Sequence, residues 1–163
     1  MSRSVFSDKR GIAAVECALT GTLLLIIVGG LADFPLAFWT HSLIETGVAN
    51  GATYAFQQGQ ADLTQGQQVS ASSIQAVVQN AINLKNVTVT VTGPALECMS
   101  VDQTMSPPSA TLTVAQAGSA CPNGSFPGTY VSITASYVYD PMMPFYSQMA
   151  TTNMTETANV RLY

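Results

Sequence analysis

The sequence predicts an α+β fold in which a long, kinked N-terminal transmembrane helix leads into a small antiparallel sheet packed on a second helix. Three observations support this prediction. An apolar run from Ile12 to Leu31 has the length of a bilayer span. A helical period of apolar residues follows at positions 70–83. A period of two then governs several segments between Asn86 and Leu162, which is typical of strands with one buried face.

The composition excludes one class of partner. The chain has 163 residues, of which 47% are hydrophobic and only 9% charged, and its net charge is −4. A soluble domain has about 25% charged residues. Proteins that bind nucleic acid need clustered Lys and Arg, so no nucleic-acid partner is expected.

The basic residues point to an orientation in a membrane. Arg3, Lys9 and Arg10 precede Gly11, whereas only Lys85 and Arg161 follow it. Positive charges ahead of an apolar run favour a cytoplasmic N-terminus. Residues 1–11 therefore form a leader, and the part beyond about residue 40 is expected on the far side of the membrane.

The helix is expected to extend over residues 12–56. Its first 20 residues, Ile12 to Leu31, span about 30 Å, which matches the hydrocarbon core of a bilayer. Asp33 marks the far interface, and aromatic residues follow it. Pro35 removes one backbone hydrogen bond and predicts a kink there. The alternative is two helices broken at Pro35.

Residues 57–163 are expected to form an extracytoplasmic α+β head. Gln57–Ser73 is polar and glycine-containing and predicts a linker, and Ser70 or Ser72 is a candidate cap for the next helix. The apolar face of that helix consists of Ile74, Val77, Val78, Ala81 and Ile82. The candidate strands are residues 86–92, 111–114, 130–139 and 155–162. Residues 94–128 and 140–153 are expected to be irregular surface loops that contact partners.

Two of the three cysteines fall in this head. Cys98 and Cys121 lie on the predicted oxidising side of the membrane, so a disulfide between them is expected. Two free thiols are the alternative. Cys17 lies inside the apolar run, where it is interpreted as a small helix residue.

Glu16 is the charged residue within the apolar run, and its position there requires an explanation. A carboxylate within a bilayer-length helix costs several kcal/mol unless it is paired. One interpretation places it in the cytoplasmic headgroup zone, where the cost is small. The other involves cleavage after Gly11, which gives Ile12 a free ammonium that pairs with the Glu16 carboxylate of a neighbouring helix.

These residues carry a resemblance. Lys9-Arg10-Gly11, a small or apolar quartet, Glu16 and a long apolar helix resemble the class III prepilin signal. The stretch from Arg10 to Leu19 is similar to that of the TadE-like family of minor pilins, or pseudopilins, from tight-adherence (Tad, or Flp) pilus systems. The pair Asp33-Phe34 and the small-residue helix at 44–54 extend the similarity. Cys17 departs from the family, which usually has an aromatic residue after the glutamate.

The resemblance implies a pilin-like fold and a role in pilus assembly. A prepilin peptidase would recognise Lys9, Arg10 and Gly11 and cut before Ile12, and Glu16 would act in subunit assembly. The implied partners are the other Tad minor pilins, the major Flp pilin, the inner-membrane assembly platform and inner-membrane lipid. The chain would cross the inner membrane once, with its head periplasmic or extracellular, and would join the pilus after processing.

The sequence is also compatible with other functions. A membrane-anchored or exported binding module, with an adhesin-like head, is the main alternative. Gly30-Leu31-Ala32 also fits a signal-peptidase site of an ordinary exported protein. An enzyme is the weakest class, because the only histidine, His41, lies next to the membrane exit and no metal-ligand cluster or catalytic motif is present. No cofactor is expected.

Overall fold

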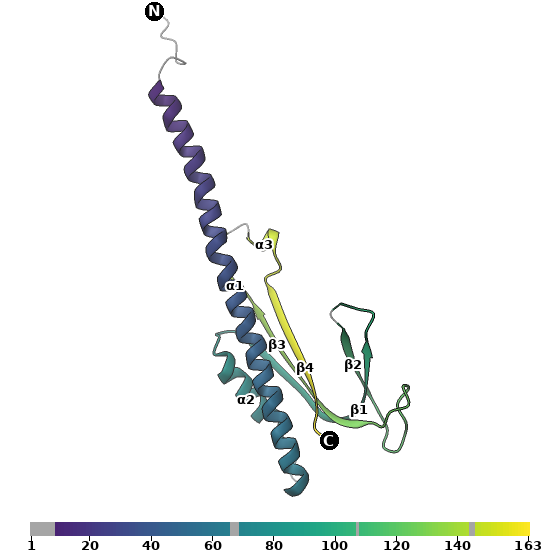
Figure 1. Ribbon diagram of the computed structural model, residues 1–163. Helices are drawn as coiled ribbons and strands as arrows, with labels where there is room; N and C mark the ends of the chain where they lie inside the picture. The colour runs from purple at the N-terminus through teal and green to yellow at the C-terminus, as the bar shows by residue number, and fades with distance from the viewer. Residues whose placement is uncertain (1–8, 66–68, 107, 144–145) are drawn as a thin grey trace, which may run out of the picture. The chain divides into compact units, whose positions relative to one another are not determined.

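The computed structural model describes residues 9–65, 69–106, 108–143 and 146–163. The described elements follow one another in this order: α1 (Lys9–Gln65), α2 (Ala71–Ile82), β1 (Thr88–Asp102), β2 (Ser109–Val114), β3 (Gly128–Val138), α3 (Tyr146–Met149) and β4 (Asn153–Arg161) (Figure 1). The chain divides into two compact units. The N-terminal unit comprises Met1–Trp39 with Asp140–Thr152, and the sheet unit comprises Thr40–Tyr139 with Asn153–Tyr163. The predicted α+β class is confirmed.

α1 is a single helix of 57 residues that contains Pro35. The alternative of two helices broken at Pro35 is therefore wrong. The predicted end at Phe56 is also wrong, because the helix continues to Gln65 through residues that were expected to begin a linker. Gln and Ala favour helix, and the only glycine in this extension, Gly59, is buried against Leu162. Tertiary packing thus keeps the extension helical.

The threonines in α1 turn their hydroxyl groups back to the helix backbone. Thr20 donates to the carbonyl of Glu16 at 2.7 Å, and Thr22 donates to the carbonyl of Ala18 at 2.8 Å. A hydroxyl that bonds the carbonyl four residues earlier needs no water. These polar residues therefore fit an apolar helix, since their donors are satisfied within it.

The four strands form one antiparallel sheet in the order β2-β1-β3-β4. β1 is longer than the predicted strand at 86–92, and its extension overturns the prediction of an irregular loop throughout 94–128. The pairing of β1 with β3 shifts register between Thr92 and Ala95, where Gly93 has φ of 100°. Pro94 cannot donate to the ladder, and a bulge is a place where a strand tolerates that loss. Beyond it β1 pairs with β2 on its other edge.

Small residues of α1 let α2 and the sheet approach it closely. Gly47, Gly51, Ala55 and Gly59 recur every four residues, which places them along one line of the helix, and all four are buried. A Cβ added at Gly47 would collide with Ile82, and one added at Gly51 would collide with Val78. We call these four residues the small-residue ridge. It forms the centre of the sheet unit.

α2 presents a narrower apolar face than its sequence predicts. Ile74, Val78 and Ile82 are buried, whereas Val77 is half-buried and Ala81 is exposed. Ser70 is the N-cap residue, as expected, but its hydroxyl pairs with the Ser72 hydroxyl at 2.7 Å and does not cap a backbone N–H of the helix. The sheet contributes Val131, Ile133 and Ala135 to the same core, all fully buried, as their alternation predicts.

Candidate assembly helix and the strap at Asp33

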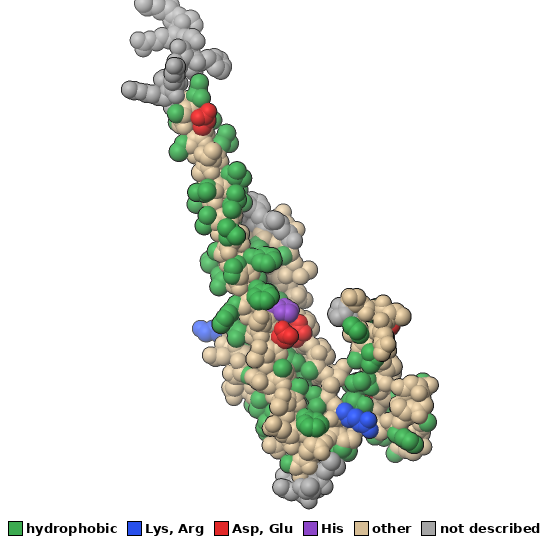
Figure 2. Space-filling model, in the orientation of Figure 1, with side chains coloured by type: hydrophobic (Ala, Val, Ile, Leu, Met, Phe, Trp, Pro, Cys, Tyr) green, Lys and Arg blue, Asp and Glu red, His purple; other side chains and the backbone are tan. Residues whose placement is uncertain are grey.

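The N-terminal part of α1 is apolar and exposed. An 18-residue window of this helix reaches a mean hydropathy of 2.2 and none of it is buried, so the helix is long and apolar enough to cross a membrane. Figure 2 shows hydrophobic side chains around this end of the helix. A helix that is hydrophobic on all sides belongs in an apolar medium. The segment is consistent with a membrane anchor or a signal.

The predicted cleavage site lies in the first turns of α1. Lys9 and Arg10 belong to the helix, but their side chains lie outside the described residues, as does all of residues 1–8. Gly11 has open space where a Cβ would stand, and the side chain of Ile12 is 55% exposed. The bond between Gly11 and Ile12 is thus free of tertiary packing within the described part of the chain.

Glu16 lies one turn after Ile12 and is exposed. Its carboxylate makes no ion pair with any residue in the described ranges. The neighbouring side chains of Ile12, Val15 and Leu19 are also exposed. Glu16 therefore presents its carboxyl group on an apolar surface, without an ion-pair partner among the side chains that the structure describes.

Asp33 has a different environment from the one expected of an interfacial residue. It is fully buried, and its carboxylate accepts two backbone hydrogen bonds from the segment Asp140–Thr152, which we call the strap. Oδ1 accepts from the N–H of Met142 at 2.9 Å, and Oδ2 accepts from the N–H of Met143 at 2.8 Å. Charge-assisted bonds of this kind are about twice as strong as neutral ones. The only signal in the sequence was an acid at the end of an apolar run.

Gly29, one turn before Asp33, also contacts the strap. A Cβ added at Gly29 would collide with the thioether of Met143. Because Gly29 and Asp33 are four residues apart, they lie on the same face of α1. Gly29 thus leaves space for the side chain of Met143, the same residue whose N–H donates to Asp33.

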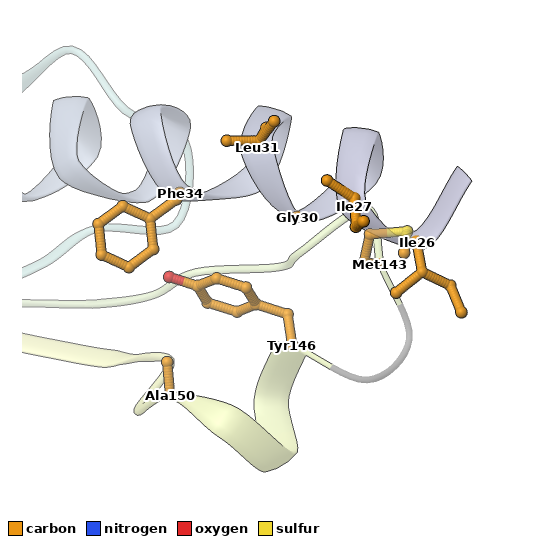
Figure 3. A pocket seen from close by; sticks show the side chains of 8 residues that line it. All are labelled: Ile26, Ile27, Gly30, Leu31, Phe34, Met143, Tyr146 and Ala150. Carbon is orange, nitrogen blue, oxygen red and sulfur yellow. The ribbon is translucent and has the colours of Figure 1, made fainter. Parts of the chain in front are cut away.

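The strap and α1 enclose an apolar groove of about 510 Å³. Its lining consists of five α1 residues, one strap residue before α3, the first residue of α3 and the residue after α3: Ile26, Ile27, Gly30, Leu31 and Phe34; Met143; Tyr146; Ala150. Figure 3 shows the Tyr146 ring in the space between α1 and α3, with its hydroxyl directed towards Phe34. The loop 140–153, predicted as an irregular surface loop that contacts partners, packs on the helix of its own chain through its described residues.

The N-terminal and central parts of α1 match a known protein family. The family model for TadE-like protein matches residues 11–53. This segment is TadE-like. The match includes Gly11, Glu16, Asp33 and the first two glycines of the small-residue ridge. Neither the search of curated proteins nor the search of solved structures returned a match.

The match over residues 11–53 is to a family that is associated with the Tad pilus machinery of the cell envelope. TadE-like proteins are generally non-enzymatic pilus components. The match covers the helix from Gly11 to Thr53 and leaves the sheet outside it.

Beyond the TadE-like segment, the predicted disulfide is confirmed. Cys98 on β1 and Cys121 are bonded, with their Cα atoms 5.6 Å apart, and both side chains are buried. The bond fastens the segment after β2 to β1. Cys17 is a free, exposed thiol within the TadE-like segment.

His41, which the sequence places next to the membrane exit, has an acidic neighbour on the sheet. His41 of the TadE-like segment lies with Nε2 2.9 Å from Oε1 of Glu156 on β4. A half-exposed pair of this type contributes little to stability. The described residues contain no group of three or more His, Cys, Asp or Glu side chains that suits a metal ion.

Proposed function

We propose that this protein is a minor pilin, or pseudopilin, that acts in priming, at the base or at the tip of a Tad/Flp-type type IV pilus used in bacterial adhesion. A prepilin peptidase removes residues 1–11. The mature chain starts at Ile12 and remains anchored in the inner membrane until it joins the pilus. Its partners are the other Tad minor pilins, the major Flp pilin and the assembly platform.

The observation that carries this proposal is the position of Glu16 in a TadE-like helix. The carboxylate lies one turn after Ile12, is exposed and lacks a partner among the described residues. Cleavage after Gly11 creates an ammonium at Ile12. The Glu16 carboxylate of one subunit then pairs with the ammonium of its neighbour, and this pairing sets the register of packed helices.

The mature N-terminus tests the processing step. Intact-mass measurement of the protein from its own cells should give a chain that begins at Ile12. Gly11→Val should block the cut, whereas Gly21→Val is a matched control, because neither glycine has a neighbour within 4 Å of its added Cβ. A mature chain that begins at Met1 would contradict the proposal, and one that begins at Asp33 would indicate signal-peptidase cleavage.

Glu16→Gln tests the assembly step separately. We expect unchanged membrane insertion and processing but reduced incorporation into sheared pilus fractions, since the neutral amide cannot pair with an ammonium as a charge. Glu45→Gln is the control, since Glu45 is an exposed glutamate of the same helix. Equal pilus incorporation of the two variants would count against the pairing.

A binding module is the second candidate function. Val114 at the end of β2 is 86% exposed and Phe126 after the disulfide is 83% exposed. Large apolar side chains exposed to this degree are common at partner contacts when they cluster. If the head binds surfaces by itself, adhesion should persist in cells that lack the prepilin peptidase. Loss of adhesion together with processing would favour the pilus role alone.

A further inference from the structure

The groove beside the strap lies at a defined level of the apolar helix. The α1 residues that line it run from Ile26 to Phe34, a distance of about 12 Å along the helix axis. They form the last third of the apolar run and the first turn after it. In an anchored chain, this level is the boundary between hydrocarbon and headgroups on the side of the membrane opposite the leader.

The wall of the groove is held in place by polar bonds outside the groove itself. Asp33 binds the backbone of Met142 and Met143, and Met143 also fills the space left by Gly29. Among the described residues that line the groove, the side chains are apolar except for the hydroxyl of Tyr146. A groove with this chemistry, at this depth, faces the part of the lipid acyl chains that lies next to the headgroups.

We propose that the groove binds one acyl chain of a membrane phospholipid from the leaflet opposite the leader. This inference rests on the membrane-anchored state in the proposed function. The volume of about 510 Å³ lies within the usual range of about 300–1,000 Å³ for small-molecule sites. A second helix, about 10 Å wide, would need roughly 900 Å³ over the same 12 Å, so the groove suits a narrower occupant. The lipid covers the apolar α1 residues of the groove while the protein is anchored in the membrane.

Photocrosslinking tests the proposal on the full chain. The protein is reconstituted into vesicles of phosphatidylethanolamine and phosphatidylglycerol that carry a diazirine on one acyl chain, and the cross-linked residues are mapped by mass spectrometry. We expect cross-links on Met143 and Tyr146 of the strap in addition to those on α1.

Two variants fill the groove from opposite sides. Gly30→Leu adds a side chain on the helix, where an added Cβ meets nothing within 4 Å, and Ala150→Leu adds one on the other wall. Both should abolish the strap cross-links and leave those near Leu19 unchanged. Gly21→Leu is the matched control, because its Cβ is equally free and Gly21 does not line the groove.

The outcomes separate this inference from the proposed function. Cross-links on α1 with none on the strap would overturn the groove site and leave the anchor intact. Strap cross-links that survive both filling variants would also overturn the groove site. A disulfide-linked protein dimer formed by a Met143→Cys variant that also carries Cys17→Ser would assign the groove to a second copy. No cross-links on any part of α1 would overturn the membrane anchor together with the groove.

Discussion

The Oδ2 atom of Asp33 accepts a hydrogen bond from the backbone N–H of Met143 at 2.8 Å, although the two residues are 110 positions apart in the sequence. Its other oxygen binds the preceding N–H of the strap. The carboxylate is therefore a clamp that fastens a distant segment to the end of the apolar helix. Burial of such a group is tolerated because both oxygens are hydrogen-bonded.

Asp33→Asn should release the strap. The amide retains one acceptor oxygen, so one of the N–H groups of Met142 and Met143 faces an NH₂ group and loses its partner, at a cost of about 1–3 kcal/mol. Hydrogen exchange at these two amides in detergent micelles should accelerate accordingly. Asp140→Asn is the control, because Asp140 is exposed on the same strap. Unchanged exchange in the Asp33 variant would show that the clamp does not hold the strap.

Gly51→Ala should destabilise the sheet unit. The new Cβ would collide with Cγ2 of Val78, a stiff β-branched side chain, and such overpacking costs about 1–3 kcal/mol. Gly21→Ala should instead be neutral or stabilising, because its Cβ is unobstructed and alanine favours helix. Thermal unfolding of the full chain checks both. Val78→Ala should partly rescue Gly51→Ala, and an absence of rescue would argue against this contact.

Reduction of the disulfide should lower the free energy of unfolding. The bond between Cys98 and Cys121 joins residues 23 positions apart, and closing such a loop stabilises by about 3 kcal/mol in the chain-entropy model. Denaturant unfolding of the full chain with and without a reductant measures the difference. Cys17→Ser should leave the midpoint unchanged, since that thiol is free and exposed. A reductant effect that persists in a Cys98→Ser/Cys121→Ser variant would refute the assignment.

The turn after β1 should respond to acid. The hydroxyl and the backbone N–H of Thr104 both donate to Oδ1 of Asp102, and these bonds hold the pKa of its carboxyl below the usual value. Because the folded pKa is lowered, the stabilisation is present above the unfolded pKa of about 3.9 and is lost as the pH falls through the folded value. Carboxyl NMR titration should show this low pKa. Thr104→Val should raise it, and an unchanged titration would contradict the cause.

The elements with a local period were predictable from the sequence, and the contacts between distant segments were not. The apolar run and the alternation around Ile133 each repeat within a few residues, so they identify a helix and a strand directly. The binding of Met143 by Asp33 leaves no local pattern, because it depends on how the chain returns after β3. The extra helical turns after Phe56 likewise depend on burial of Gly59 against Leu162.

In the candidate assembly helix, too, the local signals were predictable from the sequence and the contacts with distant residues were not. Gly11 and Glu16 form a short linear signal, and two cysteines in one polar region suggest a bond. The small-residue helix at 44–54 was recognised only through the family resemblance. The residues that Gly47 and Gly51 contact, Ile82 and Val78, lie on another helix. A stripe of small residues shows that something approaches closely without showing what.

The pairing of Val138 with Asn153 is the last rung of the β3–β4 ladder, and the whole strap lies between these two residues. The sheet is thus closed as a hairpin at the base of the strap, whatever the strap contains. Because the entropy of closing a loop rises slowly with its length, this insert can lengthen, shorten or change composition while the strands keep their register. Variation is therefore inexpensive here, and a new strap grafted between Val138 and Asn153 can change what covers Asp33 without redesign of the sheet.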